Sequence, residues 1–138
     1  MDGRPPAGPY RGRMEPADVV AQLWARIEHR DWPAVRTLLD DRLVVRWPVT
    51  GETFTGPDAF VAVQSEYPEG WSIRVLRIVA QGPQVVAEVE VPQAGVGIFR
   101  TASFAEVTDG RIVALTEYWV TVDSETPPAW RAPYRTVN

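Results

Sequence analysis

The chain contains no cysteine and no lysine, and these two absences remove whole classes of chemistry. Without cysteine there is no disulfide bond, no thiolate nucleophile and no cysteine-ligated zinc or iron–sulfur site. All fourteen basic residues are arginine, so no lysine is available to form a Schiff base with a carbonyl substrate. Any catalysis by this chain must therefore use other groups.

Histidine and activated serine are scarce as well. The single histidine, His29, lies in a polar stretch at the predicted end of a helix, where a solvated side chain near the negative end of the helix dipole is expected. No serine occupies a Gly-x-Ser-x-Gly turn, which argues against a serine–histidine–acid triad. Carboxylate, tyrosine, indole and guanidinium groups remain, and we expect neither a metal ion nor a cofactor.

Charge and hydropathy argue against two kinds of partner. The net charge is −4 and the pI is near 5.0, so the chain lacks the basic field that attracts a nucleic-acid backbone. No apolar run approaches the ~20 residues that cross a bilayer, and the N-terminus lacks the apolar core of a secretory signal. We therefore expect a cytoplasmic protein that binds neither nucleic acid nor membrane.

Turn-forming residues divide the chain into three parts. Residues 1–14 are rich in proline and glycine and predict a flexible leader. Residues 15–122 carry the periodic apolar patterns of one folded domain with one core. Residues 123–138 predict an extended, proline-rich tail, in which Trp130 packs against the sheet or a partner subunit.

Within the domain, helices precede a long series of strands. One helix is predicted to begin near Glu15, a second at its N-cap Asp31 and to end at Asp40-Asp41, and a third at Gly56. Strands are predicted at 43–47, 53–55, 71–80, 84–91, 97–107 and 111–122, with a hairpin at Asp109-Gly110. This order predicts an α+β fold, a cone in which three helices cover one face of a curved, mostly antiparallel sheet around a pocket.

Acidic residues interrupt two of the predicted strands. Glu88 and Glu90 share one face of their strand, since side chains two residues apart point the same way. Glu117 shares a face with Leu115 and Trp119 in the last strand. These acids either face water or line the pocket, and the two interpretations separate a surface ion pair from an acid–base site with a raised pKa.

Three segments resemble the nuclear transport factor 2-like superfamily in its SnoaL-like, or polyketide cyclase-like, branch. They are Asp31–Pro48, similar to the family's helix–turn–helix–strand opening, Phe54–Phe60, similar to its strand-to-helix step, and Val107–Trp119, similar to its closing hairpin. The likeness covers residues 16–122 by element order. It implies the cone-shaped fold, which hosts enzymes, binding proteins and transport adaptors alike.

The resemblance carries little of the family's chemistry over to this chain. The three catalytic positions of the related steroid isomerases fall at Trp47, Leu23 and Ala102, none of which can play the family role. The Asp–Arg–Asp set of limonene-epoxide-hydrolase-like relatives falls at Glu88, Glu90 and Glu117, so that the arginine is replaced by an acid. Arg100, in the neighbouring strand, is the expected substitute guanidinium.

The resulting candidate site combines two acids with a ring-lined pocket. We expect Glu117 and Glu88 inside as catalytic residues, and Glu90 at the rim or in a salt bridge. The substrate-binding candidates are Trp47, Tyr67, Trp71, Arg100, Phe104, Leu115 and Trp119. The outer sheet face, including Val85, Ala87, Val89, Val91 and Tyr118, is expected to pair two subunits into a homodimer, because relatives commonly bury that face in this way.

Three functions remain open at this point. In the first, the chain is a cofactor-independent acid–base enzyme of the isomerase, cyclase or epoxide-hydrolase type that acts on a small apolar molecule. Alternatively, it binds such a molecule without catalysis, or it is a dimeric protein-interaction module. The orientation of the acidic side chains separates these possibilities.

Overall fold

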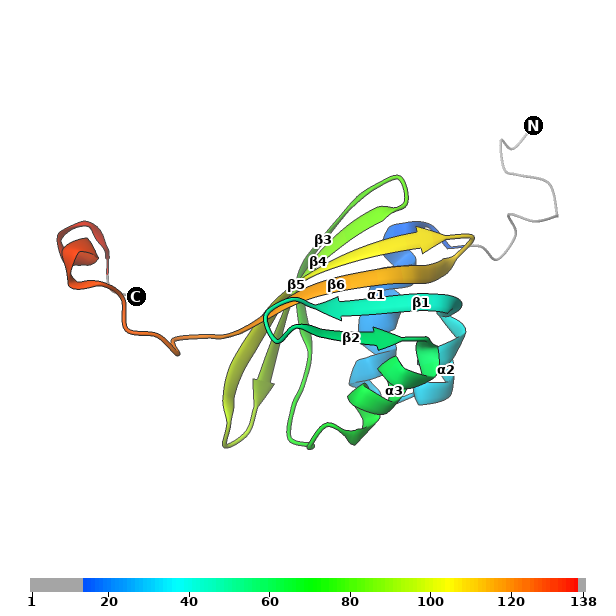
Figure 1. Cartoon of the computed structure of the whole chain (residues 1–138), viewed down its shortest axis with the longest axis horizontal. Coiled ribbons are helices and arrows are strands. Elements are labelled where there is room, and N and C mark those ends of the chain that lie inside the picture. The colour runs from blue at the N-terminus through cyan, green and yellow to red at the C-terminus, as the bar shows by residue number, and fades with distance from the viewer. Residues whose placement is uncertain (1–13, 137–138) are drawn as a thin grey trace.

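The computed structural model describes residues 14–136 as three α-helices, a six-stranded sheet and one short 3₁₀ helix (Figure 1). Of the predicted leader, all residues but Met14 lie outside the described part of the chain. The predicted architecture is confirmed, because the helices pack on a curved and mostly antiparallel sheet. None of the described helices is long and apolar enough to cross a membrane.

The helices begin where the sequence places proline in a first helical turn. Helix α1 (Pro16–Glu28) buries the predicted apolar stripe, which consists of Val19, Val20, Leu23, Trp24 and Ile27. Helix α2 (Trp32–Thr37) is capped by Asp31, whose carboxylate accepts a hydrogen bond from the Ala34 amide at 3.2 Å. Helix α3 (Pro57–Glu66) follows Gly56, which has a φ of 90°.

The second helix ends earlier than predicted. It stops at Thr37, and Asp40 and Asp41 lie in the first strand, β1 (Leu39–Trp47), instead of closing the helix. The early strand start has a structural cause, because the Ile112 amide donates to the Leu38 carbonyl and Leu39 pairs with Ile112 in the last strand. A tertiary contact thus overrides the local helical pattern.

The remaining strands complete one continuous sheet. They are β2 (Glu52–Thr55), β3 (Arg74–Gln81), β4 (Gln84–Gln93), β5 (Gly97–Thr108) and β6 (Arg111–Thr121). The strand order is β2-β1-β6-β5-β4-β3. Only β1 and β6 pair in parallel, while the other neighbours are antiparallel. The predicted Asp109-Gly110 turn joins β5 to β6, and both residues have positive φ.

One face of this sheet packs on the helices and forms the core. In β4 the odd-numbered side chains Val85, Ala87, Val89 and Val91 are buried. In β6 a bulge changes the alternation, since Val107 pairs with Ile112 but Glu106 pairs with Ala114. The extra residue lets Ile112 and then Leu115 both point inward.

The tail leaves the end of β6 and stands away from the sheet (Figure 1). It contains a 3₁₀ helix, η1 (Ala129–Tyr134), within the stretch predicted to be extended. The side chains of Trp130 and Tyr134 are 71% and 84% exposed. Trp130 therefore does not pack against the sheet of its own chain, and its contact with a partner subunit stays a prediction.

Candidate functional site

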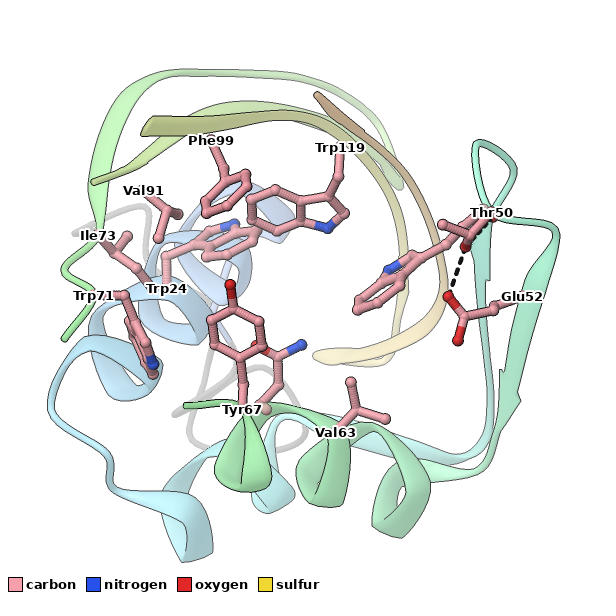
Figure 2. A pocket seen from close by; sticks show the side chains of 12 residues that line it. Trp24, Thr50, Glu52, Val63, Tyr67, Trp71, Ile73, Val91, Phe99 and Trp119 are labelled. Atoms are coloured by element: carbon pink, nitrogen blue, oxygen red, sulfur yellow. Dashed lines mark hydrogen bonds between the residues drawn. The ribbon is translucent and has the colours of Figure 1, made fainter. Parts of the chain in front are cut away.

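A cavity of about 260 Å³ opens between the curved sheet and the helices (Figure 2). Six aromatic rings form most of its wall: Trp24, Trp47, Tyr67, Trp71, Phe99 and Trp119. The other lining residues are Thr50, Glu52, Val63, Gln64, Ile73 and Val91. The wall is thus almost entirely apolar and aromatic, which favours molecules rich in hydrocarbon.

A helix, a loop and three strands bring these rings together. Trp24 comes from α1, Tyr67 follows the end of α3, Trp71 precedes β3, and the other rings stand on strands of the sheet. Trp24 and Trp119 meet edge to face with ring centroids 6.5 Å apart. Figure 2 shows the Tyr67 hydroxyl pointing into the hollow, beneath Trp24 and Phe99.

Two polar contacts hold the wall near the ends of α3 and α1. The Tyr67 hydroxyl donates to the Gln93 side-chain carbonyl at 2.6 Å. Arg30 lies over the Trp71 ring at 3.3 Å and donates to the Trp71 carbonyl and to both carboxylate oxygens of Glu69. The loop that carries Trp71 is therefore fixed by stacking and by hydrogen bonds at the same time.

Glu117 lies inside the molecule, directly behind two of the cavity-lining rings. Its side chain is buried, and it accepts three hydrogen bonds. Trp47 Nε1 and Trp119 Nε1 donate to Oε1 at 3.1 and 3.3 Å, and Ser103 Oγ donates to Oε2 at 2.8 Å. Ser103 is the direct cross-strand partner of Glu117, so the strand register itself places this contact.

Burial controls the ionisation of Glu117. Loss of hydration raises the pKa of this carboxyl, and the hydrogen bonds from Ser103, Trp47 and Trp119 oppose that rise. No ion pair with Glu117 is present among residues 14–136, so its compensation comes from neutral donors alone. Glu117 is not part of the cavity surface, and its carboxylate meets the cavity only through the two indoles.

The structure brings together four of the predicted substrate-binding residues. Trp47, Tyr67, Trp71 and Trp119 all line the cavity. Leu115 points inward as well, but it is fully buried in the core and does not reach the cavity. The roles of all five in binding stay predictions.

The predicted inward orientation of Glu88, Arg100 and Phe104 is wrong. Glu88 lies on the outer face of the sheet and pairs with Arg77 at 2.8 Å. Phe104 is 46% exposed and packs on Tyr118, also outside. The reason is the alternation of β4, whose odd-numbered residues from Val85 to Val91 are all apolar and form the core, so that the even-numbered acids and their β5 neighbours face outward.

The prediction of the outer surface was wrong for the same reason, because the two faces of β4 are the reverse of those expected. Val85, Ala87, Val89 and Val91 were expected there and lie in the core instead, whereas Tyr118 is outside as predicted. The observed outer face carries exposed apolar side chains from three strands, β3, β5 and β6: Val79, Ile98, Phe104, Tyr118 and Val120. The apolar outer face is therefore real but is built from different residues.

Glu90 forms the predicted salt bridge, on this outer face. Its carboxylate accepts hydrogen bonds from Arg100 at 2.8 and 3.0 Å and from Arg74. The Arg100 guanidinium, followed by that of Arg74, holds the pKa of Glu90 below its usual range. Arg100 is thus the counter-ion of an outer-face acid, and it contributes nothing to the cavity.

Several lining residues were not predicted from the sequence as part of the site. Trp24 was assigned to the core stripe of α1, and Phe99 was given no role. Phe99 shares a strand face with Thr101 and Ser103, which are polar, so the sequence pattern of β5 gave no signal that this face is buried. Among residues 14–136, no group of three or more acidic or histidine side chains is arranged to hold a metal ion.

The chain is similar in sequence and in fold to known proteins. A family model described as a SnoaL-like domain matches residues 20–115. A candidate ketosteroid isomerase from Kribbella flavida is 25% identical, with a TM-score of 0.80 over 89% of this chain and 90% of that one. A nuclear-transport-factor-2-like protein of unknown function from Burkholderia xenovorans is 23% identical, with a TM-score of 0.74 over 89% and 94% of the two chains.

A third similar structure is an epoxide hydrolase of the limonene-epoxide-hydrolase type from M. tuberculosis. It is 22% identical, with a TM-score of 0.66 over 76% of this chain and 82% of that one. A search of curated proteins gave no match. At identities below 25%, such a likeness shows the shared fold alone.

Proposed function

Because this chain belongs to the SnoaL-like domain family, we propose that its cavity binds a small molecule that is largely hydrocarbon. The observation that carries this proposal is the set of six aromatic rings that line a cavity of about 260 Å³. A wall of this kind offers a large apolar contact area and selects flat or alicyclic shapes. The volume lies just below the ~300–1,000 Å³ of pockets for drug-sized ligands, so the ligand is small.

Filling the cavity from one side tests this proposal. Val63 lines the cavity from α3, and Val63→Phe adds a ring there without removing a polar group. Val79→Phe on the outer face, where Val79 is 63% exposed, is the matched control. We expect lipophilic ketones and epoxides that raise the melting temperature of the wild type and of Val79→Phe to lose this effect on Val63→Phe. Equal shifts in all three proteins would refute binding in this cavity.

A second candidate function is acid–base catalysis by Glu117. The specific observation in its favour is a buried carboxyl with a raised pKa behind Trp47 and Trp119, since burial tunes carboxyls for proton transfer. Glu88 does not assist, because it lies on the opposite face. Proton transfer to a ligand then requires the two indoles to part or to relay the contact.

Turnover of an epoxide or enolisable ketone by wild type and by Glu117→Gln decides between the two functions. Catalysis predicts that Glu117→Gln abolishes turnover and leaves ligand affinity within about tenfold, because the proton transfer acts only in the transition state. Binding alone predicts no turnover by either protein. Turnover that is unchanged in the variant would exclude Glu117 as the catalytic group.

We also propose that the outer sheet face pairs two copies of the chain. Phe104 and Tyr118 pack edge to face there at 6.1 Å, and both are nearly half exposed. The ion pairs of Glu88 and Glu90 flank these rings and provide a polar rim. A docking function for another protein on the same face is the alternative, and the size of the chain in solution separates the two.

A further inference from the structure

The side chains of the cavity wall include one acid but no base. Glu52, the first residue of β2, is the one lining residue of acidic or basic type. None of the arginines among residues 14–136 lines the cavity, and neither does His29. A ligand that enters therefore meets ring surfaces and negative charge.

The wall also offers few hydrogen-bond donors. The indole N–H groups of Trp47 and Trp119 are turned away to Glu117. Those of Trp24 and Trp71 are buried without a partner in the described part of the chain and are closed to solvent. A neutral ligand with a carbonyl oxygen would thus find none of the four indole donors available.

Acceptors remain on the cavity side. The Tyr67 hydroxyl points into the hollow and donates its hydrogen bond to Gln93, so its oxygen can act toward a ligand only as an acceptor (Figure 2). Glu52 adds a carboxylate at the rim, while Gln64 on α3 carries an amide that can act in either sense. The cavity wall therefore offers a ligand more hydrogen-bond acceptors and aromatic ring faces than hydrogen-bond donors.

Glu117, which lies behind Trp47 and Trp119, adds to the attraction of the wall for a positive charge. In its ionised form the Glu117 carboxylate polarises the Trp47 and Trp119 rings through their hydrogen bonds, which makes the ring faces more attractive to positive charge. The guanidinium of Arg30 lies on Trp71 but outside the cavity, and Glu69 neutralises it through two hydrogen bonds. Arg30 therefore does not oppose a positive ligand.

We infer that the ligand of this cavity is a small organic cation, a tertiary or quaternary amine attached to a flat or alicyclic group. This inference rests on the proposed binding function and specifies its ligand class. A primary ammonium is a compact and strongly hydrated charge, so its transfer from water to a wall made mostly of rings is costly. An alkylated ammonium is easily desolvated and gains attraction from rings on several sides, as in aromatic cages.

A pair of molecules of equal shape and different charge tests the inference. The probes are 3-hydroxyphenyltrimethylammonium and its neutral counterpart 3-tert-butylphenol, measured by isothermal titration calorimetry on the wild-type chain. Because both bury the same apolar surface, the charge alone separates their affinities. We expect the cation to bind about thirtyfold more tightly, the effect of a desolvated cation–π contact of ~2 kcal/mol.

Each outcome of this comparison has a distinct meaning. Equal affinities, or tighter binding of the phenol, would overturn the cationic ligand class and leave the proposed binding function standing. Failure of both probes to bind at millimolar concentration would count against both proposals. Binding of either probe that persists in Val63→Phe would place it outside the cavity and overturn both.

A matched pair of variants assigns the role of Glu117. Glu117→Gln keeps an acceptor for both indoles and removes the charge, whereas Glu88→Gln removes a carboxylate from the outer face of the sheet. We expect Glu117→Gln to weaken binding of the cation at least fivefold and to leave binding of the phenol unchanged. Glu88→Gln should alter neither. An unchanged affinity ratio in Glu117→Gln would remove Glu117 from ligand recognition.

Discussion

Replacing Glu117 by glutamine or by leucine separates its charge from its hydrogen bonds. A glutamine carbonyl accepts from Trp47 and Trp119 as the carboxylate does, and its amide can donate to Ser103 Oγ. Leucine has a similar size but no acceptor. The two variants therefore share the loss of charge, and only Glu117→Leu loses the contacts.

The cost of losing the contacts follows from the three donors. A buried donor left unpaired costs about 1–3 kcal/mol, and three of them are released in Glu117→Leu. Trp47 and Trp119 are only partly buried and border the cavity, so their rings have room to turn toward water and the lower end of this range applies. We expect Glu117→Leu to be about 2–4 kcal/mol less stable than Glu117→Gln, a large share of the ~5–15 kcal/mol typical of a domain.

The cost of the charge depends on pH, and its sign follows from the raised pKa of Glu117. The folded protein holds this proton more tightly than the unfolded chain, whose carboxyl has the ordinary value of 4.5. The stabilising contribution is complete below that value and is lost as pH rises through the folded pKa. Glutamine does not titrate, so Glu117→Gln should gain stability relative to wild type as pH increases.

Urea unfolding at about pH 5 and about pH 8, followed by tryptophan fluorescence and circular dichroism, measures both effects. Glu117→Gln should have the smaller change of unfolding free energy between these conditions. If Glu117→Leu were as stable as Glu117→Gln, the three hydrogen bonds would have no net value. If Glu117→Gln kept the pH dependence of the wild type, Glu117 would not be its source.

Three further predictions concern the surroundings of the cavity. Arg30→Gln removes the cation stacked on Trp71, so hydrogen exchange of residues 68–73 should become faster, while exchange in the sheet stays unchanged. The pKa of Glu90 is lowered in the folded protein, so this residue stabilises the fold at pH values above the pKa of the unfolded chain and loses that contribution as the pH falls through its folded pKa. The loss of stability on acidification, measured by thermal unfolding, should therefore be smaller in Glu90→Gln than in wild type. Tyr118→Glu places a charge in the apolar outer face and should convert a dimer into a monomer of unchanged melting behaviour, as measured by light scattering; a wild-type chain that is already monomeric would contradict the dimer.

The element order could be predicted because local patterns determine it, whereas the inward face of the last strand was inferred from the resemblance to the family. The bulge at Val113 was not visible in the sequence, yet it explains why both Ile112 and Glu117 lie inside. In β4 the apolar odd-numbered residues indicated the correct face, and the register taken from related proteins led to the opposite one. Alternation within a strand is therefore the stronger guide where all side chains of one parity are apolar.

The contacts of Glu117 could not be predicted, for a physical reason. Its donor Trp47 lies seventy residues away along the chain and comes from a different strand. Only the parallel pairing of β1 with β6 brings the two together, and nothing local in either segment indicates that pairing. The end of the second helix at Thr37 was missed for the same reason, since β6 also draws Leu39 into the sheet.

The parallel pair of β1 and β6 also governs how the chain reaches its folded state. On the ribosome, β1 emerges early but its partner is among the last strands made, so the nascent chain exposes unpaired strand edges for most of its synthesis. Contacts of such long sequence separation slow folding, because loop closure precedes any stabilising contact. A chain that ends before β6 has no cavity and two open edges, on β1 and β5, which makes it a natural target for chaperones and proteases.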